Sequence, residues 1–336
     1  MSDIGATWQM AMAHRWEKPG TPFALRTSMQ PRHVFSFALG LLSVPLASPT
    51  LSFAEAAPIP FVFTTIRGGA NHHDESRAVA FAPNGGVCAV GKTAGGMPTT
   101  DSTVVTASGA GAGTAAPTDV WLACWSQTGA LQWSTVFGGG GYDAGYAIAI
   151  DNTGIYVGGR AGMGLPTSAG VVQAEFAGDS APSTEFGAQD GFIAKYDLGG
   201  QRLWVSYLGD SSGSFVHDLA VDRTGAVYAV LTDVRANNAL VTAGAAIAAR
   251  PGGADAVVAK FNANGALVWG SYLGGSKDDL AAPSLAVNDA GEVYVVGSGN
   301  STNFPTTPGA SQASFHGGAT DLTLTIFAAD GKSLVN

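Results

Sequence analysis

One pattern of residues occurs four times along the chain, and an internal repeat of this length restricts the fold to stacked copies of one structural unit. Each copy starts with a short apolar segment that ends in glycine, and these glycines are spaced 70, 71 and 65 residues apart. The four positions are Gly68, Gly138, Gly209 and Gly274. A unit of this size cannot bury an apolar face alone, so we expect each copy to pack against its neighbours.

Each repeat then contains a predicted β-hairpin. An alternating apolar segment runs into a turn, as in AIAIDNTG, and a second apolar segment follows, as in IYVGG. Asp or Asn followed closely by glycine is typical of such turns, because the polar side chain bonds the backbone and glycine accepts a positive φ. The turn glycines are Gly85, Gly154, Gly225 and Gly291. We therefore predict two antiparallel strands in this part of every repeat.

Two further strands are expected after a longer connection. An aspartate opens the third predicted strand in each repeat, at positions Asp119, Asp190, Asp255 and Asp321. In the first three repeats another glycine turn leads to a fourth strand with a tryptophan, namely Trp133, Trp204 or Trp269. We expect these rings to fill the space between repeats. Four short antiparallel strands are the content of one propeller blade, so the predicted fold class is all-β, a β-propeller of four-stranded blades.

The repeat resembles a known bacterial family, the seven-bladed β-propeller repeat. The family consensus runs roughly YLGG, a loop with two aspartates, AIAVD, G-VYV-G, FPTTPGA and D-AFVAK. Residues 271–310 follow it most closely, as SYLGGSKDDLAAPSLAVNDAGEVYVVGSGNSTNFPTTPGA. The resemblance covers about residues 61–336 and implies a propeller on an exported or surface-attached protein. It implies no single shared activity.

The number of repeats leaves two architectures open. We place the repeats at about residues 68–137, 138–208, 209–273 and 274–336. Together with residues 61–67, FVFTTIR, they form the predicted propeller domain, residues 57–336. The segment 61–67 resembles a fourth strand with no blade before it, and it is predicted to complete the last blade and close a four-bladed, monomeric ring. The alternative is a truncated reading frame that belongs to a larger propeller.

Residues 1–56 are predicted to be an N-terminal extension and signal peptide. The apolar run VFSFALGLLSVPLA, residues 34–47, follows basic residues, and small residues precede a cleavage position after Ala56. The run is too short to span a bilayer, and a start at Met29 would give a conventional leader. We therefore expect a secreted, periplasmic or cell-surface protein with no transmembrane segment after cleavage.

The net charge of the chain argues against one class of function, and the variation among its loops favours another. The chain carries 16 Lys and Arg against 25 Asp and Glu, a formal charge of −9, with no long basic run, so phosphate-mediated nucleic-acid binding is not expected. The connections between second and third strands differ most between repeats, and variable loops on a rigid scaffold commonly carry binding. We predict a non-catalytic scaffold for an extracellular protein or glycan. The alternatives are a hydrolase or lyase acting on an extracellular polymer, and a structural spacer of the cell envelope.

Polar residues in the loops before the first strands are the candidate site residues. The cluster His72, His73 and Asp74 offers ligands for a transition metal, but adjacent side chains rarely converge on one ion, so we favour a solvated loop. Aspartates recur in these loops and offer oxygen ligands for calcium, namely Asp74, Asp143, Asp218, Asp278 and Asp279. Turn capping by single carboxylates is the simpler explanation, and no cofactor is predicted. In the enzyme alternative, these aspartates and His72, His73 or His217 supply the acid and base.

The two cysteines, Cys88 and Cys124, fall in the predicted second and third strands of the first repeat. Neighbouring strands bring such a pair within reach of a disulfide in an oxidising compartment, provided that the register places the Cβ atoms together. Two separate buried thiols are the alternative.

Two segments match the sequence patterns of enzyme motifs but lack the structural context that those motifs need. Residues 86–93, GVCAVGKT, fit the phosphate-binding loop pattern, and residues 209–213, GDSSG, fit the nucleophile elbow. Both motifs need a helix after the glycine-rich segment, whereas the repeat predicts a strand in the first case and a loop in the second. We therefore expect neither chemistry.

Overall fold

The computed structural model describes residues 65, 67–68, 73–100, 117–178, 185–211, 213–235, 238–280 and 282–335. All of these residues belong to one compact unit, Pro58–Asn336. Their regular secondary structure consists of β-strands, and none of them forms a helix with the length and hydropathy of a membrane span. The prediction of an all-β fold is confirmed for the part of the chain that the structure describes.

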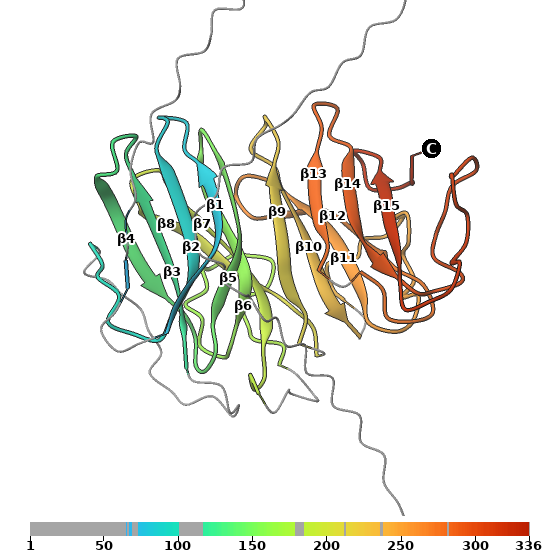
Figure 1. Ribbon diagram of the computed structural model, residues 1–336, viewed down its shortest axis with the longest axis horizontal. Helices are drawn as coiled ribbons and strands as arrows, with labels where there is room; N and C mark the ends of the chain where they lie inside the picture. Colours follow the sequence, from blue (N-terminus) through green and yellow to red (C-terminus); the bar gives the residue numbers. More distant parts are fainter. Residues whose placement is uncertain are drawn as a thin grey trace, which may run out of the picture. The chain divides into compact units, whose positions relative to one another are not determined.

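The strands form four antiparallel sheets, each built from consecutive strands (Figure 1). The first sheet contains β1 (Asp74–Phe81), β2 (Val87–Thr93), β3 (Asp119–Trp125) and β4 (Leu131–Phe137). The second contains β5 (Ala144–Asp151), β6 (Gly154–Ala161), β7 (Asp190–Tyr196) and β8 (Arg202–Leu208). The third contains β9 (Phe215–Val221), β10 (Val227–Val234), β11 (Asp255–Phe261) and β12 (Leu267–Leu273). The fourth contains β13 (Ser284–Val287), β14 (Val293–Gly299) and β15 (Asp321–Phe327).

The sheets are the blades predicted from the repeats, because each one packs its first strand against the first strand of the next. Strand β5 contacts β1 on one side and β9 on the other, and β9 in turn contacts β13. The buried core is divided among the junctions between blades. One cluster joins Leu122 of the first blade to Val157 of the second, and another joins Val258 of the third blade to Val295 of the fourth. The antiparallel blade architecture of a β-propeller is therefore confirmed.

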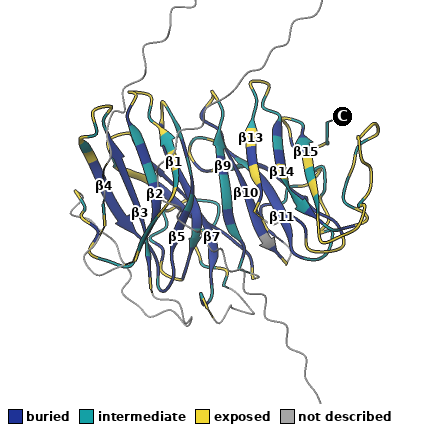
Figure 2. Ribbon diagram, in the orientation of Figure 1, coloured by how far each residue is buried: buried dark blue, intermediate teal, exposed yellow. Residues whose placement is uncertain are grey.

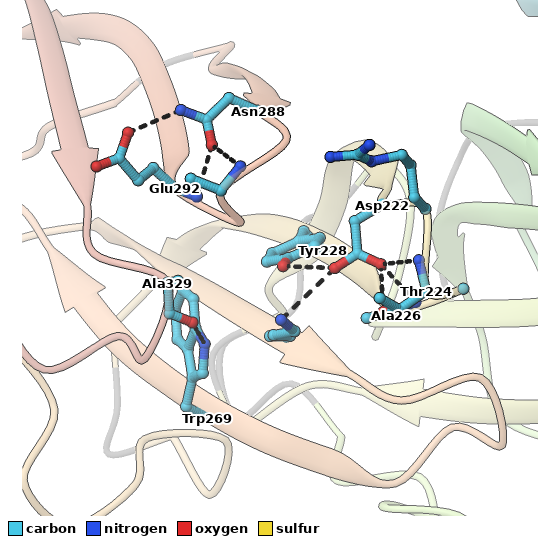
Figure 3. Close-up of polar contacts among 12 residues, drawn as sticks. Asp222, Thr224, Ala226, Tyr228, Trp269, Asn288, Glu292 and Ala329 are labelled. Atoms are coloured by element: carbon cyan, nitrogen blue, oxygen red, sulfur yellow. Dashed lines mark hydrogen bonds and ion pairs between the residues drawn. The ribbon is translucent and has the colours of Figure 1, made fainter.

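The tryptophans of the outer strands link each blade to the next. The indole N–H groups of Trp133, Trp204 and Trp269 donate to backbone carbonyls in the following blade, at 3.0, 3.3 and 3.0 Å. Figure 3 shows this bond from Trp269 to Ala329. Gly265, at φ +82°, lies against the ring of Trp204, where a Cβ atom would stand 3.1 Å from the indole carbons. The prediction that these rings fill the space between repeats is confirmed.

The outer edge of each complete blade is covered by the connection between its second and third strands. The backbone amides of Thr100, Ser168 and Thr242 donate to carbonyls of β4, β8 and β12 at 3.0, 2.9 and 2.9 Å. These residues belong to the Pro-Thr-Thr motif of the repeat or its variants. The motif therefore satisfies an exposed strand edge that would otherwise be open to pairing with another chain.

The two cysteines lie directly opposite each other and form a disulfide. Cys88 of β2 pairs in register with Cys124 of β3, with 4.0 Å between their Cα atoms. In the next two blades the same two positions hold a tyrosine and a lysine. The lysine nitrogen lies 4.8 Å from the centre of the tyrosine ring in each case, in the pairs Tyr156 with Lys195 and Tyr228 with Lys260. A covalent link therefore occupies a position that a cation–π contact fills elsewhere.

Loss of the disulfide should destabilise the first blade. The bond closes a loop between residues 36 apart. Cross-linking a loop of this length lowers the conformational entropy of the unfolded chain, which stabilises the fold by about 4 kcal/mol. The Cys88→Ser, Cys124→Ser double variant should therefore unfold at a lower urea concentration than the wild type. Dithiothreitol should destabilise the wild type and leave the variant unchanged. Two free thiols per chain in denaturant without reductant would contradict the disulfide.

The predicted closing strand, residues 61–67, is described only at Thr65 and Arg67, and neither residue is in a β-strand. The Arg67 guanidinium donates to Ser134 Oγ of the first blade at 2.9 Å and to the backbone carbonyl of Pro98. The remaining residues of that segment lie outside the described residues. Whether 61–67 completes the last blade stays a prediction, as does the division of the chain at residues 56 and 57.

Candidate functional site

Two of the predicted calcium aspartates, Asp143 and Asp279, accept hydrogen bonds from backbone amides. Asp143 lies between β4 and β5, is fully buried, and accepts the amide of Gly139 at 3.0 Å and that of Gly162 at 2.8 Å. It thereby ties the start of the first strand to the end of the second. Asp279 does the same in the fourth blade, where it accepts the amides of Gly275, Asn300 and Ser301 at 2.7, 2.9 and 3.2 Å. Carboxylates used in this way fix the blade geometry.

The remaining candidates are spread over several environments. Asp278 accepts the amide of Ala254 at 2.8 Å and lies 3.8 Å from a guanidinium nitrogen of Arg235. His73 and Asp74 stand at the start of β1, and His72 lies outside the described residues. Within the described ranges, no three or more His, Cys, Asp or Glu side chains are grouped so that they could hold a metal ion. Calcium binding therefore remains a prediction without a ligand set.

Aspartates that open third strands lie close to the loop aspartates at two blade junctions. A Cβ atom at Gly138 would stand 2.3 Å from Asp119 Oδ1 and 2.8 Å from Asp143 Oδ2, so the two carboxyl groups meet over this glycine. Burial raises the pKa of Asp119 to about 6. Burial, together with the charge of Asp119, raises the pKa of Asp143 to about 7, although hydrogen bonds from two backbone amides lower it. These two carboxyl groups therefore take up protons near neutral pH.

The junction of the third and fourth blades repeats this arrangement. Asp255 is fully buried, and burial and the nearby charge of Asp279 raise its pKa to about 8. The fold therefore raises the pKa of a buried carboxyl group at each of these two junctions. Asp143 has no exposed surface, so it does not meet a substrate in solution as the enzyme alternative would require.

A different group of side chains gathers where the first three blades meet. We call it the cation–aromatic cluster. It consists of Glu75, Arg77, Lys92, Tyr142, Tyr146, Arg160, Phe186, Phe215 and His217. These residues come from the starts of β1, β5 and β9, the ends of β2 and β6, the segment between β4 and β5, and the connection that precedes β7.

Arg160 lies at the centre of the cluster. Its guanidinium carbon stands 3.9 Å from the ring centre of Phe186, 4.7 Å from that of Tyr142, and 5.6 Å from those of Tyr146 and Phe215. A planar cation is attracted to the negative faces of aromatic rings at such distances. The contacts join the second blade, its long connection and the third blade into one surface.

The electrostatics of the cluster are positive although the whole chain is acidic. Lys92 Nζ donates to the Tyr142 hydroxyl at 2.9 Å, and the Lys92 and Arg160 charges hold the pKa of Tyr142 below its usual value although burial acts in the opposite direction. Glu75 forms ion pairs with Arg77 and with Lys92. Three cations against this one carboxylate leave the cluster able to attract an acidic group.

The cluster lies on the end of the blades from which the variable connections emerge. Each connection begins where a second strand ends, and Lys92 and Arg160 occupy the ends of β2 and β6. Phe186 itself belongs to the connection 162–189. Of this group, the sequence analysis singled out only His217, as a candidate acid or base in the enzyme alternative, and it did not predict the cluster. Lys92 lies in the segment that matches the phosphate-binding loop pattern, and this segment forms strand β2 as the repeat predicts. Tyr142 and Tyr146 lie in the segment GGYDAGY.

Four antiparallel sheets with tryptophan, aspartate and turn-glycine positions that repeat from sheet to sheet define a repeat protein of the β-propeller class. Residues 268–305 match the family described as Beta-propeller repeat, SBBP. The match runs from β12 to the connection after β14. No curated protein matches the chain in a sequence search.

Proposed function

We propose that the protein is an exported, non-catalytic binding scaffold that recognises an extracellular protein or glycan through the blade end that carries the variable connections. The observation that carries this proposal is the contact between Arg160 and Phe186, in which the guanidinium carbon lies 3.9 Å from the centre of the ring. It joins a variable connection to a cation–aromatic surface on the rigid blades.

The composition of this surface supports binding. Aromatic residues and arginine are enriched at the centres of binding interfaces, where they offer a large contact area at a low cost in conformational entropy. The partly exposed side chains of the cluster include Tyr146, Phe186, Phe215 and His217, and Arg77 is exposed. Flat rings suit the apolar face of a sugar or a peptide, and the excess of cations suits a carboxylate on either.

Two features support export. The apolar run at residues 34–47 has the layout of a signal peptide. The Cys88–Cys124 disulfide is typical of proteins that fold in an oxidising compartment.

The proposal is tested by binding of the full chain to an array of uronic-acid glycans, neutral glycans and extracellular proteins. The double variant Arg77→Ala, Phe186→Ala should lose at least about tenfold in affinity for the ligand found, because the loss of 1.4 kcal/mol of contact is a factor of ten. Arg223→Ala provides the matched control. Its side chain is 72% exposed on the hairpin turn between β9 and β10, at the opposite end of the blade.

Two outcomes would count against the proposal. Equal losses in the cluster variant and in Arg223→Ala would remove the cluster from the binding surface. Release of new reducing ends or new peptide fragments from the bound ligand would favour the polymer-acting enzyme instead.

A further inference from the structure

The aspartate that opens the third strand is held by two hydrogen-bond donors in the second blade. Asp190 Oδ2 accepts the side-chain amide of Gln173 at 3.4 Å and the backbone amide of Ala177, four residues further on, at 2.6 Å. Hydrogen bonds donated to a carboxylate favour its charged form. The fourth blade repeats both bonds at 2.8 Å among the equivalent residues Gln312, His316 and Asp321.

The third blade lacks both donors. Its equivalent of Gln173 is Ile247, because the Ile247 carbonyl accepts an amide of the outer strand and the Ile247 amide donates to Ser271 Oγ, as in the second blade. An isoleucine side chain donates no hydrogen bond. Four residues further on stands Pro251, which has no N–H group. The side-chain donor and the backbone donor are therefore both missing for the same aspartate, Asp255.

Asp255 is buried without these donors. Its side chain is 0% exposed, and neither carboxyl oxygen has a hydrogen-bond partner. Figure 2 shows β11, the strand that begins at Asp255, as buried along nearly its whole length. A charged carboxylate without partners is far more costly to bury than a neutral carboxyl group. This environment therefore favours the protonated form.

The charges that surround Asp255 act mainly in the same direction. Burial and the charge of Asp279 raise the pKa of Asp255 to about 8, and Asp278 of the same loop adds to this effect. The charge of Arg250, in the connection before β11, and a nearby backbone amide lower the pKa. Arg235 lies 3.8 Å from Asp278 and offsets part of its charge. The carboxylates therefore outweigh the cations around this group.

Asp255 lies beside the bonds that join the third blade to the fourth. The amide of Asp279 donates to the Ala254 carbonyl at 2.8 Å, and the amide of Ala254 donates to Asp278 Oδ1 at 2.8 Å. A negative charge on Asp255 would repel both Asp278 and Asp279. Ionisation of this one carboxyl group would therefore oppose the contact between the two blades.

The geometry points to a pH-sensitive joint between the third and fourth blades: Asp255 holds a proton while the blades are joined and releases it when they part. When the joint opens, the carboxyl group meets water, its O–H bond breaks and the proton passes to the solvent. Each pH unit between the ordinary pKa of an aspartate and that of the buried group then favours the open joint by about tenfold. The junction of the second and third blades, where Asp190 keeps both donors, should not respond in this way.

The first test is hydrogen exchange of the full chain at pH 6, 7 and 8, corrected for the intrinsic exchange rate at each pH. Protection of the Ala254 and Asp279 amides should fall by at least about tenfold from pH 6 to pH 8, whereas amides in the middle of β11 should change less. In Asp255→Asn most of this fall should disappear, because an amide side chain cannot ionise. An unchanged fall in this variant would overturn the proposal.

A pair of variants at position 247 tests the physical cause. Ile247→Gln restores the side-chain donor of the other blades, so it favours the ionised form and the fall in protection should end at a lower pH. Ile247→Leu is the matched control, because it keeps an apolar side chain without a donor and should behave as the wild type. Equal pH dependence in the two variants would contradict the proposed role of the missing donor.

Infrared spectroscopy at pH 7 reports the proton directly. The band of protonated carboxyl groups should be weaker in Asp255→Asn and in Ile247→Gln than in the wild type, and unchanged in Ile247→Leu. Bands of equal intensity in all four proteins would show that Asp255 is ionised in the folded chain. The proposal would also be overturned if calcium restored protection at pH 8 in the wild type and not in Asp255→Asn, because the unpartnered oxygens would then hold a cation rather than a proton.

Discussion

Raising the pH from 4 to 7 is expected to lower the free energy of unfolding by about 3 kcal/mol through Asp143 alone. In the unfolded chain this carboxyl loses its proton near pH 3.8, whereas in the folded chain burial and the charge of Asp119 raise its pKa to about 7. Between these values the folded state holds one proton more than the unfolded state. Each pH unit therefore favours unfolding by about 1.4 kcal/mol.

Urea unfolding followed by tryptophan fluorescence at pH 5, 6 and 7 measures this slope. Asp143→Asn cannot ionise, so its stability should fall less steeply with pH than that of the wild type, by about 1.4 kcal/mol per unit. Asp119→Asn removes the neighbouring charge and should end the slope at a lower pH. Asp289→Asn, whose side chain is 82% exposed in the wild type, should keep the wild-type slope. Identical slopes in the wild type and in Asp143→Asn would show that this carboxyl is already ionised in the folded state.

Trp204→Ala should lower the free energy of unfolding by about 4 kcal/mol, as expected when a large buried aromatic ring is removed. The ring is 7% exposed, and it packs with the second and third blades. Its indole N–H donates to Ala263 O at 3.3 Å. The variant leaves a cavity between two blades and removes one of the two hydrogen bonds that the Ala263 carbonyl accepts, the other coming from Lys195 Nζ at 3.1 Å.

Two further variants separate these contributions in the same denaturation experiment. Trp204→Phe keeps most of the ring and loses the hydrogen bond, so it should cost about 1 to 2 kcal/mol. Leu203→Ala alters the adjacent residue, which is 46% exposed, and should change stability by less than about 0.5 kcal/mol. A loss in Leu203→Ala as large as that in Trp204→Ala would mean that the strand, rather than the junction between blades, is the sensitive element.

The strands could be predicted from the sequence because each repeat confirms the others. The third strand predicted from Asp190 is observed as Asp190–Tyr196, and the turn glycines Gly85 and Gly225 have positive φ values. Local chemistry fixes such features. A strand of alternating or apolar residues followed by a polar turn is the same structure in all four copies.

The roles of individual polar residues could not be read in this way, because they depend on register. Asp218 was grouped with Asp143 by its place in the repeat, yet it lies within β9 and accepts the Leu285 amide of the next blade at 2.9 Å. Ser214 stands at the same distance after Gly209 as Asp143 after Gly138. A shift of a few residues in loop length thus changes which side chain reaches the blade junction.

The cation–aromatic cluster was hidden for a different reason. Arg160 and Phe186 are separated by a long connection, and Phe215 comes from the following blade. Their approach depends on the path of that connection and on the angle between blades, which no local pattern encodes. Basic residues at the ends of two second strands, in a chain with only 16 Lys and Arg, were the one available signal.

The covering of the outer strands by the Pro-Thr-Thr segments has a consequence for redesigning this protein. Ser168 and Gln173 hold β8 at two points, whereas the residues of the same connection beyond them make no backbone bond of this kind to β8 among those described. Phe176 packs against the ring of Tyr207, and the Ala177 amide donates to Asp190 Oδ2 at 2.6 Å. New recognition sequences are therefore best grafted after Ala177. Grafts that replace Ser168 would leave the edge of β8 unpaired and should promote fibrous aggregation. Ser168 and Gln173 should therefore be kept in any loop that is exchanged.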